Sequence, residues 1–319
     1  MIPWNPFVCN YYVTLRCNDT CEFCEIWQRE EFKTLEEAPL ENIIRNLEDL
    51  KKMGVRYVDV TGGEPLLRAD TPLILKASKE RGFFTVLTTN GILFKDRAFE
   101  VSPFVDMLLF SLDSPIEEEH DRIRGVSCYS QVIEGLKIAK KLVNNVAINF
   151  TVTRDSVLYL PEMVDLSEKL GVFLWINPVF RYGGAEGFQK ESVDYIARYR
   201  KKKNVAFNLA GLDLILQGGN NVGRPACRAA SSVVTILPDD RLVLPCFYKQ
   251  DFSAKIDGKL RDLYRSSRAS YRKRQGRFEE CRGCLAWPYM NPSFLHGFDK
   301  KFFLGLYSLG SLLWKESKF

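Results

Sequence analysis

Cys17-Asn18-Asp19-Thr20-Cys21-Glu22-Phe23-Cys24 is the most informative stretch of this sequence. Its three cysteines have the spacing C-x3-C-x2-C and follow an apolar, β-prone run over residues 7–15. A tight loop that carries three thiolates can ligate three irons of a cubane 4Fe–4S cluster. The fourth iron would then lack a protein ligand, and a small molecule with an amine and a carboxylate could chelate it.

The cysteine spacing resembles the signature of the radical S-adenosylmethionine (SAM) superfamily, and two other features agree with that family. Gly62-Gly63-Glu64-Pro65 follows a predicted strand over 57–60, where the family places the backbone that holds the methionine amine. Phe23 directly precedes the third cysteine, where the family has an aromatic residue near the adenine. The resemblance implies a 4Fe–4S cluster with SAM at its open iron, bound by Cys17, Cys21 and Cys24.

A zinc knot or a redox thiol cluster is the alternative interpretation of these three cysteines. Structural zinc sites usually have four nitrogen or sulfur ligands, whereas the next cysteine, Cys128, lies far along the chain. Because the Gly-Gly-Glu-Pro segment also stands at the expected distance, the radical SAM interpretation is favoured.

The composition is that of a folded protein of 319 residues with no strong electrostatic bias. A hydrophobic fraction of 46% allows a sizeable core and argues against global disorder. The net charge of +5 is too small to indicate a nucleic-acid partner. The basic runs 201–203 and 272–274 are most simply solvated faces, and docking of a ferredoxin or flavodoxin as electron donor is the functional alternative.

The cysteine content and the N-terminus indicate a reducing compartment. Nine cysteines without a signal peptide argue against a secreted disulfide scaffold. No apolar run reaches the roughly 18–20 residues that a membrane span needs. We therefore expect a cytoplasmic protein, where exposed clusters are protected from oxygen.

Apolar runs alternate with amphipathic helical stretches over the first two thirds of the chain. This alternation predicts a parallel sheet with right-handed crossovers. Six βα units are fewer than a closed eight-stranded barrel needs, so we expect an α/β fold with a partial (β/α)6 parallel barrel over residues 1–200, as the resemblance also implies. The predicted strands are 7–15, 57–60, 83–88, 107–112, 146–152 and 173–176, and the predicted helices are 39–54, 71–80, 130–143 and 160–170.

Ligands bind at the carboxyl ends of the strands in parallel α/β folds, and several polar residues fall there. Ser111 and Asp113 end the fourth predicted strand on one face, where the family contacts the ribose hydroxyls of SAM. A turn cap for Ser114-Pro115 is the alternative role. Asn149 and Thr151 alternate with apolar residues on the fifth strand and are expected to face the nucleoside.

Arg124-Gly125 resembles a family element whose arginine pairs with the SAM carboxylate. Arg122 could replace Arg124 in that role, and either could be a surface charge. The chain has only two histidines, so histidine acid–base chemistry is not expected to dominate. We expect His120 to be exposed and His296 to be structural.

A second set of four cysteines lies in the predicted region 201–290: Cys227, Cys246, Cys281 and Cys284. After about residue 187 the βα alternation stops, and a hairpin over 232–244 and a helix over 260–272 separate these cysteines. Four thiolates suffice for a second, fully ligated 4Fe–4S cluster. The order resembles the SPASM or twitch auxiliary-cluster extension of radical SAM enzymes, although no cysteine follows Cys284; zinc is the alternative.

The remaining cysteines and the tail have simpler interpretations. Cys9 and Cys128 are expected to be small buried hydrophobes. Residues 291–319 form an apolar tail, predicted as a helix that covers one mouth of the barrel. Contact with a membrane surface, with lysines near the headgroups, is the alternative.

The resemblance implies an oxidoreductase-type enzyme that cleaves SAM to a 5′-deoxyadenosyl radical and removes hydrogen from an unactivated carbon. The apolar tail and aromatic content favour an apolar substrate, and the single auxiliary set resembles tetrapyrrole-modifying members such as bacteriochlorophyllide methyl oxidases. A ribosomal peptide maturase is the enzyme alternative, disfavoured because no leader-binding domain is expected before the first strand. A non-catalytic iron–sulfur electron carrier or sensor is the alternative of another class. The sequence offers no residue as the substrate's acid or base.

Overall fold

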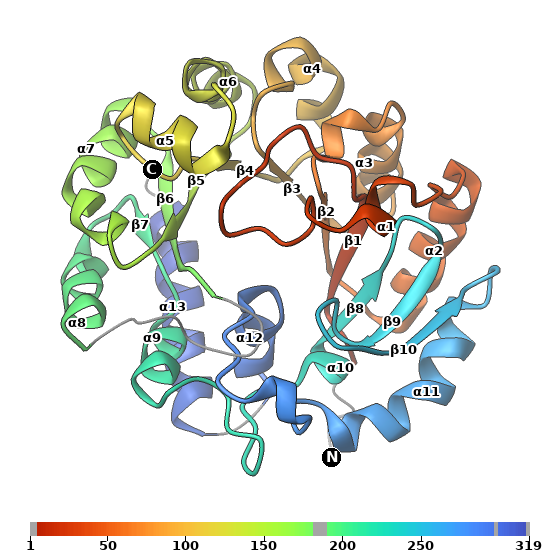
Figure 1. Cartoon of the computed structure of the whole chain (residues 1–319). Helices are drawn as coiled ribbons and strands as arrows, with labels where there is room; N and C mark the ends of the chain where they lie inside the picture. The colour runs from red at the N-terminus through yellow and green to blue at the C-terminus, as the bar shows by residue number, and fades with distance from the viewer. Residues whose placement is uncertain (1–4, 181–189, 297–298, 317–319) are drawn as a thin grey trace.

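Ten strands form one open, mixed sheet in the computed structural model, which describes residues 5–180, 190–296 and 299–316 (Figure 1). The strand order is β10-β9-β8-β1-β2-β3-β4-β5-β6-β7. Strands β1 to β7 run parallel in chain order, β8 pairs in parallel with the free side of β1, and β9 and β10 are antiparallel. The strands are β1 Val8–Thr14, β2 Tyr57–Gly62, β3 Phe84–Thr89, β4 Met107–Ser111, β5 Asn145–Val152, β6 Phe173–Pro178, β7 Val205–Ala206, β8 Val233–Ile236, β9 Arg241–Pro245 and β10 Gln250–Lys255.

Helices α1 to α8 connect the successive parallel strands β1 to β7, whereas α11, α12 and α13 follow the last strand, and the helices surround the sheet (Figure 1). The sheet stays open, so the expected partial parallel barrel is confirmed. The helices are α1 Glu30–Lys33, α2 Leu40–Met53, α3 Thr71–Glu80, α4 Phe94–Val101, α5 Glu117–Arg124, α6 Tyr129–Leu142, α7 Leu160–Leu170, α8 Lys190–Arg198, α9 Leu209–Leu216, α10 Ala229–Ser232, α11 Leu260–Arg274, α12 Trp287–Phe294 and α13 Lys300–Glu316.

Helix α2 illustrates how the sequence specifies these elements. Its apolar residues Ile43, Leu47 and Leu50 recur on one face and are buried against the sheet. The helix ends at Gly54, whose φ of 91° is left-handed and whose N–H bonds to the carbonyl of Lys51. Strong periodicity with a glycine stop is why this helix was predictable to within a residue.

The prediction that the βα alternation stops after residue 187 is wrong. Helix α8 is followed by β7, which pairs with β6, and then by α9. Strand β7 has only two residues, Val205 and Ala206, so it leaves no apolar run that a sequence pattern could reveal. Helices α4, α5 and α12 and strand β10 were also not predicted.

Helix α12 lies in the opening of the sheet, between β6–β7 on one side and β8 on the other (Figure 1). Its Trp287 donates its indole N–H to the carbonyl of Pro178 at the end of β6, over 2.5 Å. Its Tyr289 hydroxyl accepts a hydrogen bond from Thr235 on β8 over 3.3 Å. Helix α12 therefore spans the gap that the open barrel leaves.

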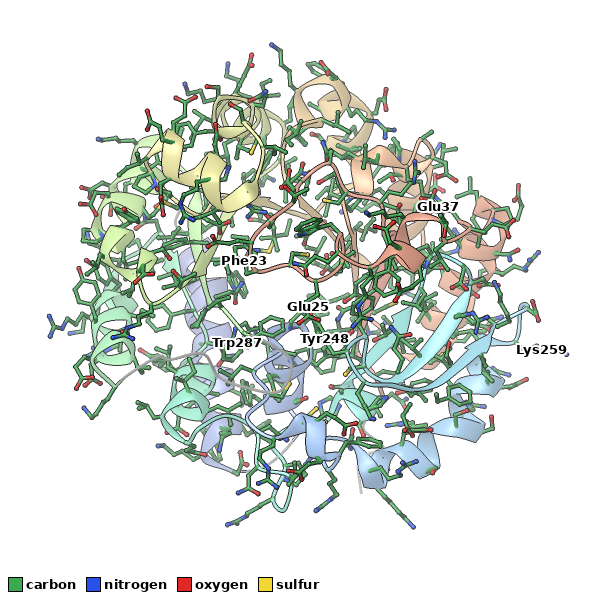
Figure 2. The ribbon with its side chains drawn as sticks, in the orientation of Figure 1. Phe23, Glu25, Glu37, Tyr248, Lys259 and Trp287 are labelled. Atoms are coloured by element: carbon green, nitrogen blue, oxygen red, sulfur yellow. The ribbon has the colours of Figure 1, made fainter. Side chains whose placement is uncertain are left out.

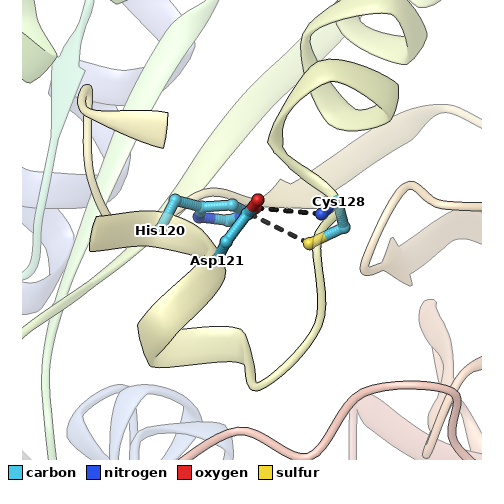
Figure 3. Close-up of side chains that lie close together, drawn as sticks. All are labelled: His120, Asp121 and Cys128. Carbon is cyan, nitrogen blue, oxygen red and sulfur yellow. Dashed lines mark hydrogen bonds between the residues drawn. The ribbon is translucent and has the colours of Figure 1, made fainter. Parts of the chain in front are cut away.

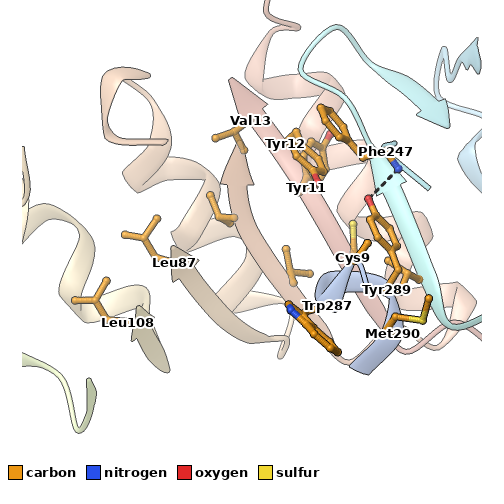
Figure 4. Close-up of a cluster of buried hydrophobic side chains, with 14 of the residues drawn as sticks. Cys9, Tyr11, Tyr12, Val13, Leu87, Leu108, Phe247, Trp287, Tyr289 and Met290 are labelled. Atoms are coloured by element: carbon orange, nitrogen blue, oxygen red, sulfur yellow. Dashed lines mark hydrogen bonds between the residues drawn. The ribbon is translucent and has the colours of Figure 1, made fainter. Parts of the chain in front are cut away.

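The core continues from the sheet into α12 without a break. Asn10 of β1 donates its side-chain amide to the Pro288 carbonyl of α12 over 3.4 Å, and Figure 4 shows the hydrogen bond from the Phe247 N–H to the Tyr289 hydroxyl of α12, over 3.0 Å. Tyr12 stacks on Phe247, which follows β9, with ring centroids 4.4 Å apart. The second cysteine region thus packs directly on the first strand of the barrel.

The C-terminal tail forms helix α13, as predicted, and packs against α9 and α12. The Ser308 hydroxyl accepts a hydrogen bond from the Leu209 N–H over 3.0 Å. Phe303 and Tyr307 are exposed on the other side of the helix. Within the described residues, no helix combines the length and the apolar character needed to cross a membrane.

Candidate functional site

The first cysteine loop leaves β1 and is fastened to the end of helix α5. The N–H groups of Thr20 and Glu22 bond to the carbonyls of Arg124 and Ile123, each over 3.0 Å. Gly125 ends the helix in a left-handed conformation, and a Cβ there would lie 2.1 Å from the Thr20 hydroxyl. This close approach explains the glycine after Arg124 and fixes the loop against α5.

Local hydrogen bonds shape the loop that carries the three thiols. Cys21 is buried, whereas Cys17 and Cys24 are partly exposed. The Cys24 N–H bonds to the Cys21 carbonyl over 3.1 Å, and the Asp19 N–H points at the Cys17 sulfur over 3.4 Å. Burial raises the pKa of Cys17 and of Cys21 to about 12, so the metal-free thiols are protonated and metal binding must release protons.

Gly62 and Gly63 lie against the chain that enters the cysteine loop. The N–H groups of Gly63 and Glu64 bond to the carbonyls of Thr14 and Arg16, over 2.9 and 2.8 Å. A Cβ on Gly62 would lie 1.9 Å from the Thr14 oxygen, and one on Gly63 would lie 2.2 Å from the Arg16 oxygen. Only glycine lets this backbone lie so close to the chain that enters the cysteine loop.

The Glu64 carboxylate is fully buried and is already paired within the protein. It accepts hydrogen bonds from the N–H groups of Leu66 and Asn90 and from the Thr89 hydroxyl, over 2.7 to 2.9 Å. Burial raises the pKa of Glu64 to about 7 against these three donors. Glu64 therefore joins the ends of β2 and β3, and its carboxylate is committed to the protein.

Asp113 and Arg124 form a buried ion pair behind the cysteine loop. An Arg124 nitrogen lies 2.5 Å from the Asp113 carboxylate, and another lies 3.6 Å from Asp19. The latter nitrogen also lies 3.5 Å from the Cys21 sulfur. The guanidinium carbon is 5.8 Å from the centre of the Phe23 ring. The structure thus brings Asp113 and Arg124 together with Asp19, Cys21 and Phe23 of the cysteine loop.

Ser111 and Asn149 are direct neighbours in the sheet, at the carboxyl ends of β4 and β5. Asn149 accepts a hydrogen bond from Asn177 of β6 over 2.7 Å. Asp113 accepts one from the Thr151 N–H over 2.9 Å. Ser111 and Asn149 are both partly exposed, so they remain able to meet a nucleoside, whereas Asp113 is committed to the protein.

His120 is buried, and the prediction that it is exposed is wrong. Its Nδ1 accepts the Asp113 N–H over 3.2 Å, and its Nε2 lies 3.4 Å from the Cys128 sulfur (Figure 3). Burial lowers the pKa of His120 to about 3, so the ring is neutral. Asp121 accepts the N–H groups of Cys128 and Tyr129, which makes this group a helix cap rather than an open ligand set.

A cavity of about 210 Å³ opens beside the first cysteine loop. Tyr248 forms one wall, and Figure 2 shows it close to Glu25 in the centre of the molecule, with Phe23 on the opposite side. Thr151 and Val179 reach the cavity from the ends of β5 and β6. The lining residues are mostly aromatic or aliphatic, with one cysteine and two charged groups: Phe23, Cys24, Glu25, Ile26, Arg29, Phe32, Thr151, Val179, Phe180, Phe247 and Tyr248.

The four cysteines of the second set are all buried: Cys227, Cys246, Cys281 and Cys284. They are neighbours, because Cys284 and Cys281 add to the effect of burial in raising the pKa of Cys227 to about 12. Burial raises the pKa of Cys246 well above its ordinary value, and Cys227 and Cys284 add to the shift. Four buried thiols in one place fit a fully ligated metal centre.

Asn220 connects the separate segments that carry the second set. Its amide nitrogen donates to the carbonyls of Gly276 and Cys281, over 2.8 and 3.0 Å. Its side-chain oxygen accepts the N–H groups of Ala226 and Cys227, over 3.0 and 3.2 Å. No local pattern in the sequence distinguishes this asparagine.

Tyr248 lies between the two cysteine sets and was also missed. Burial raises its pKa well above the ordinary value, and the neighbours that add to the shift include Cys24 of the first set and Cys246 and Cys284 of the second. Its ring packs edge-on against Phe180, with centroids 5.5 Å apart. The sequence gives no direct sign of this role for Tyr248. The nearest feature that it offers is Pro245-Cys246, after which the chain turns into the cavity.

Residues 11–166 match the family model of the radical SAM superfamily. The chain therefore carries a radical SAM domain over these residues, and such a domain implies a 4Fe–4S cluster and SAM as cofactors. The residues fit both groups, since the three thiols lie near one another after the carboxyl end of β1, with Cys17 near Glu64 at the end of β2.

Curated relatives carry the name probable GTP 3′,8-cyclase. The protein of Sulfolobus acidocaldarius is 27% identical over 267 residues, which are 80% of this chain and 80% of that protein. A protein of Saccharolobus islandicus is 34% identical over 159 residues, 49% of this chain and 51% of that protein. The chain thus spans about half the length of the Saccharolobus relative.

Solved structures share the fold at low sequence identity. Streptococcus suis SuiB bound to the precursor peptide SuiA has a TM-score of 0.66 and 20% identity, covering 82% of this chain and 64% of that chain. Histidine-tagged anSMEcpe with bound AdoMet has a TM-score of 0.64 and 17% identity, covering 84% of this chain and 83% of that chain. At these identities the likeness establishes the fold.

Proposed function

We propose that this protein is a radical SAM oxidoreductase that removes a hydrogen atom from an apolar substrate bound beside Cys24. The cavity carries the proposal, because Cys24 of the first set and the aromatic wall around Tyr248 line the same space of about 210 Å³. Bound together, the cluster and SAM supply a 5′-deoxyadenosyl radical, and the protein supplies position and exclusion of water.

The SAM site that we propose uses the backbone at Gly62 and Gly63 for the methionine amine. Phe23 would pack near the adenine, and Ser111 and Asn149 would meet the ribose from the ends of β4 and β5. Glu64, Asp113 and Arg124 would support this site without contacting SAM. Their charged groups are already paired within the protein. Preformed pairing of this kind fixes a site before its ligand arrives.

Four aromatic residues form much of the cavity lining: Phe23, Phe180, Phe247 and Tyr248. Such a surface favours a flat, apolar substrate. The cavity is smaller than the roughly 300–1,000 Å³ of typical ligand pockets, so we propose that one edge of the substrate enters while the rest stays outside. Oxidation of a methyl group at the edge of a tetrapyrrole, as in a bacteriochlorophyllide, is the specific reaction that we favour.

The second cysteine set gives the proposed reaction an electron acceptor. We propose that its four thiolates hold a second 4Fe–4S cluster with every iron ligated by the protein. Loss of a hydrogen atom followed by loss of one electron and a proton from the substrate is a net oxidation. Tyr248, between the two sets, lies where such an electron would pass.

A second candidate is ring closure in a purine nucleotide. It is favoured by the relative that is 27% identical over 80% of both chains and is named a probable GTP 3′,8-cyclase. The charged groups in the cavity lining are Glu25 and Arg29. Their side chains are within 3.9 Å of each other, so the described cavity offers a triphosphate little uncompensated positive charge.

Anaerobic protein reconstituted with iron and sulfide, then given SAM and dithionite, tests these alternatives. We expect a methyl-bearing chlorin to raise 5′-deoxyadenosine formation several-fold over the substrate-free rate. When the methyl group of the chlorin is deuterated, deuterium should appear in the 5′-deoxyadenosine. Stimulation by GTP instead would support the cyclase, and stimulation by a cysteine-rich peptide would support a maturase. A chain that forms no 5′-deoxyadenosine under any condition would be an electron carrier.

The partners that we propose follow from the same chemistry. A ferredoxin or flavodoxin would reduce the first cluster, and the basic end of α11 at Arg272, Lys273 and Arg274 is a candidate docking face for such an acidic protein. Contact of α13 with a membrane surface is a further proposal, based on its exposed Phe303 and Tyr307.

A further inference from the structure

Arg124 is a buried arginine whose side chain reaches a cysteine of the first set. It is 6% exposed, and one of its terminal nitrogens lies 3.5 Å from the Cys21 sulfur. The other terminal nitrogen lies 2.5 Å from Asp113. A buried guanidinium is costly unless it is paired, and here two of its three neighbours are acidic, Asp113 and Asp19.

The position of this guanidinium relative to Cys21 is fixed from both ends. The Arg124 carbonyl accepts the Thr20 N–H over 3.0 Å, so the backbone of α5 is joined to the cysteine loop itself. Asp113 is held in turn by the Thr151 N–H over 2.9 Å. Arg124 therefore cannot turn toward another ligand without breaking a buried ion pair.

We propose that Arg124 is a positioning residue that donates a hydrogen bond to the Cys21 thiolate and thereby raises the reduction potential of the first cluster. The proposal rests on the proposed function, because it assumes a cluster on Cys17, Cys21 and Cys24. Reduction adds one electron to the cluster, and hydrogen bonds to the ligating sulfurs and nearby charge set its potential. A fixed cation at 3.5 Å favours the reduced, more negative state.

Asp19 acts in the opposite direction. Its carboxylate lies 3.7 Å from the Cys21 sulfur and 3.6 Å from Arg124. A carboxylate beside a thiolate disfavours the added electron, and Arg124 offsets this repulsion. The two residues therefore form an opposed pair, and their removal must shift the potential in opposite directions.

The inference differs from the expectation that Arg124 binds the SAM carboxylate. In the structure its two terminal nitrogens are occupied by Asp113, Asp19 and Cys21. Arg122, two residues earlier, provides the matched control. It is largely exposed and pairs with Glu119 over 2.8 Å and with Glu22 over 2.9 Å.

The test is a redox titration of the reconstituted full chain, followed by electron paramagnetic resonance. The first cluster is identified as the signal that changes when SAM is added. We expect Arg124→Gln to make reduction roughly tenfold less favourable, a negative shift of about 59 mV for one electron. Arg124→Lys should give a smaller negative shift, Asp19→Asn a positive shift, and Arg122→Gln no shift.

SAM affinity, measured as the concentration that half-completes the spectral change, separates the two roles. We expect Arg124→Gln to retain it within about threefold, since only the cluster's potential changes. An unshifted potential with a loss of SAM affinity above tenfold would overturn the proposal and make Arg124 a SAM ligand. Stability losses in Arg124→Gln and Asp19→Asn without opposed potential shifts would also overturn it, because they would indicate a merely structural role.

Two further outcomes keep the test decisive. If Arg124→Gln does not fold, the signs of the shifts in Arg124→Lys and Asp19→Asn decide the question. If the wild-type signal does not respond to SAM at all, the proposed function fails rather than the role of Arg124. The first cluster is then identified as the signal that Cys24→Ser removes, and its potential still reports on Arg124.

Discussion

The two cysteine sets of this protein are built in opposite ways. The first is a single loop of eight residues with three thiols, two of which are partly exposed. The second draws four buried thiols from three separate segments, and Asn220 joins two of these segments, those of Cys227 and Cys281. The first loop borders a cavity through Cys24. The difference indicates that one centre is built to receive a ligand and the other to stay closed.

The largest expected effect comes from breaking the open set. Cys24→Ser should abolish 5′-deoxyadenosine formation, because a cluster held by two thiolates cannot present an open iron to SAM. Iron content should fall from about eight to about four atoms per chain, because the second set keeps its own cluster. Iron and sulfide analysis with a product assay checks both points. Complete loss of iron would mean that the two sets do not form independently.

Asn220→Ala should selectively weaken the closed set. It removes four hydrogen bonds, three of them buried, and leaves the Gly276 carbonyl and the N–H groups of Ala226 and Cys227 unpaired, while the Cys281 carbonyl keeps the Cys284 N–H. We expect the free energy of unfolding of the apo-protein to fall by about 3 kcal/mol, measured by urea denaturation. The matched control is Asn221→Ala, an exposed neighbour that caps only the following turn. Equal losses in both variants would contradict the role assigned to Asn220.

Gly63→Ala tests the backbone at Gly62 and Gly63, which we propose holds the methionine amine of SAM. The new methyl group would meet the Arg16 carbonyl at 2.2 Å, so the backbone must move by enough to cost about 1–3 kcal/mol. We expect SAM affinity to fall at least roughly tenfold, as titrated by the spectral change of the first cluster. Gly223→Ala is the control, since the nearest atom to its Cβ is a side-chain oxygen at 3.2 Å. Unchanged SAM affinity in Gly63→Ala would show that the backbone at Gly62 and Gly63 does not bind SAM.

The smallest effect is expected from a cysteine that belongs to neither set. Cys128→Ala removes a buried sulfur beside His120 and should cost about 1 kcal/mol of stability. Iron content and the signals of both clusters should stay the same. A drop in iron content would show that Cys128 has a ligand role that its helix-cap surroundings do not suggest.

The parts of the fold that were predictable have a strong local pattern. Helix α7, Leu160–Leu170, has apolar spacing and a glycine stop, and its predicted bounds agree with the structure. Strand β7 gave no signal because two residues cannot show a period, and α12 gave none because Pro288 and Pro292 oppose a helical prediction. Tertiary contacts decide such segments, and the sequence does not display them.

The candidate site shows the same division. The cysteine spacing and Gly62-Gly63 can be recognised from the sequence alone. Few residues other than cysteine can ligate an iron–sulfur cluster, and few other than glycine allow such a close backbone approach. Arg124 was singled out from the sequence as a functional candidate, but its partners could not be read from the chain, since Asp113 and Cys21 reach it only through the fold. Tyr248 enters the cavity through a turn that no residue pattern announces.

Strand β8 pairs with β1 over the register from Val8 opposite Val233 to Tyr11 opposite Ile236. The first cysteine loop follows β1, and β8 lies between Cys227 and Cys246 of the second set. The segments of the two proposed metal centres are therefore attached to neighbouring, hydrogen-bonded strands. A change in the distance between the two centres would have to break the hydrogen bonds between β1 and β8. The distance over which an electron tunnels between the centres is therefore fixed by the fold and not by a domain movement. Electron flow between them should then be governed by driving force, with geometry held constant through the catalytic cycle.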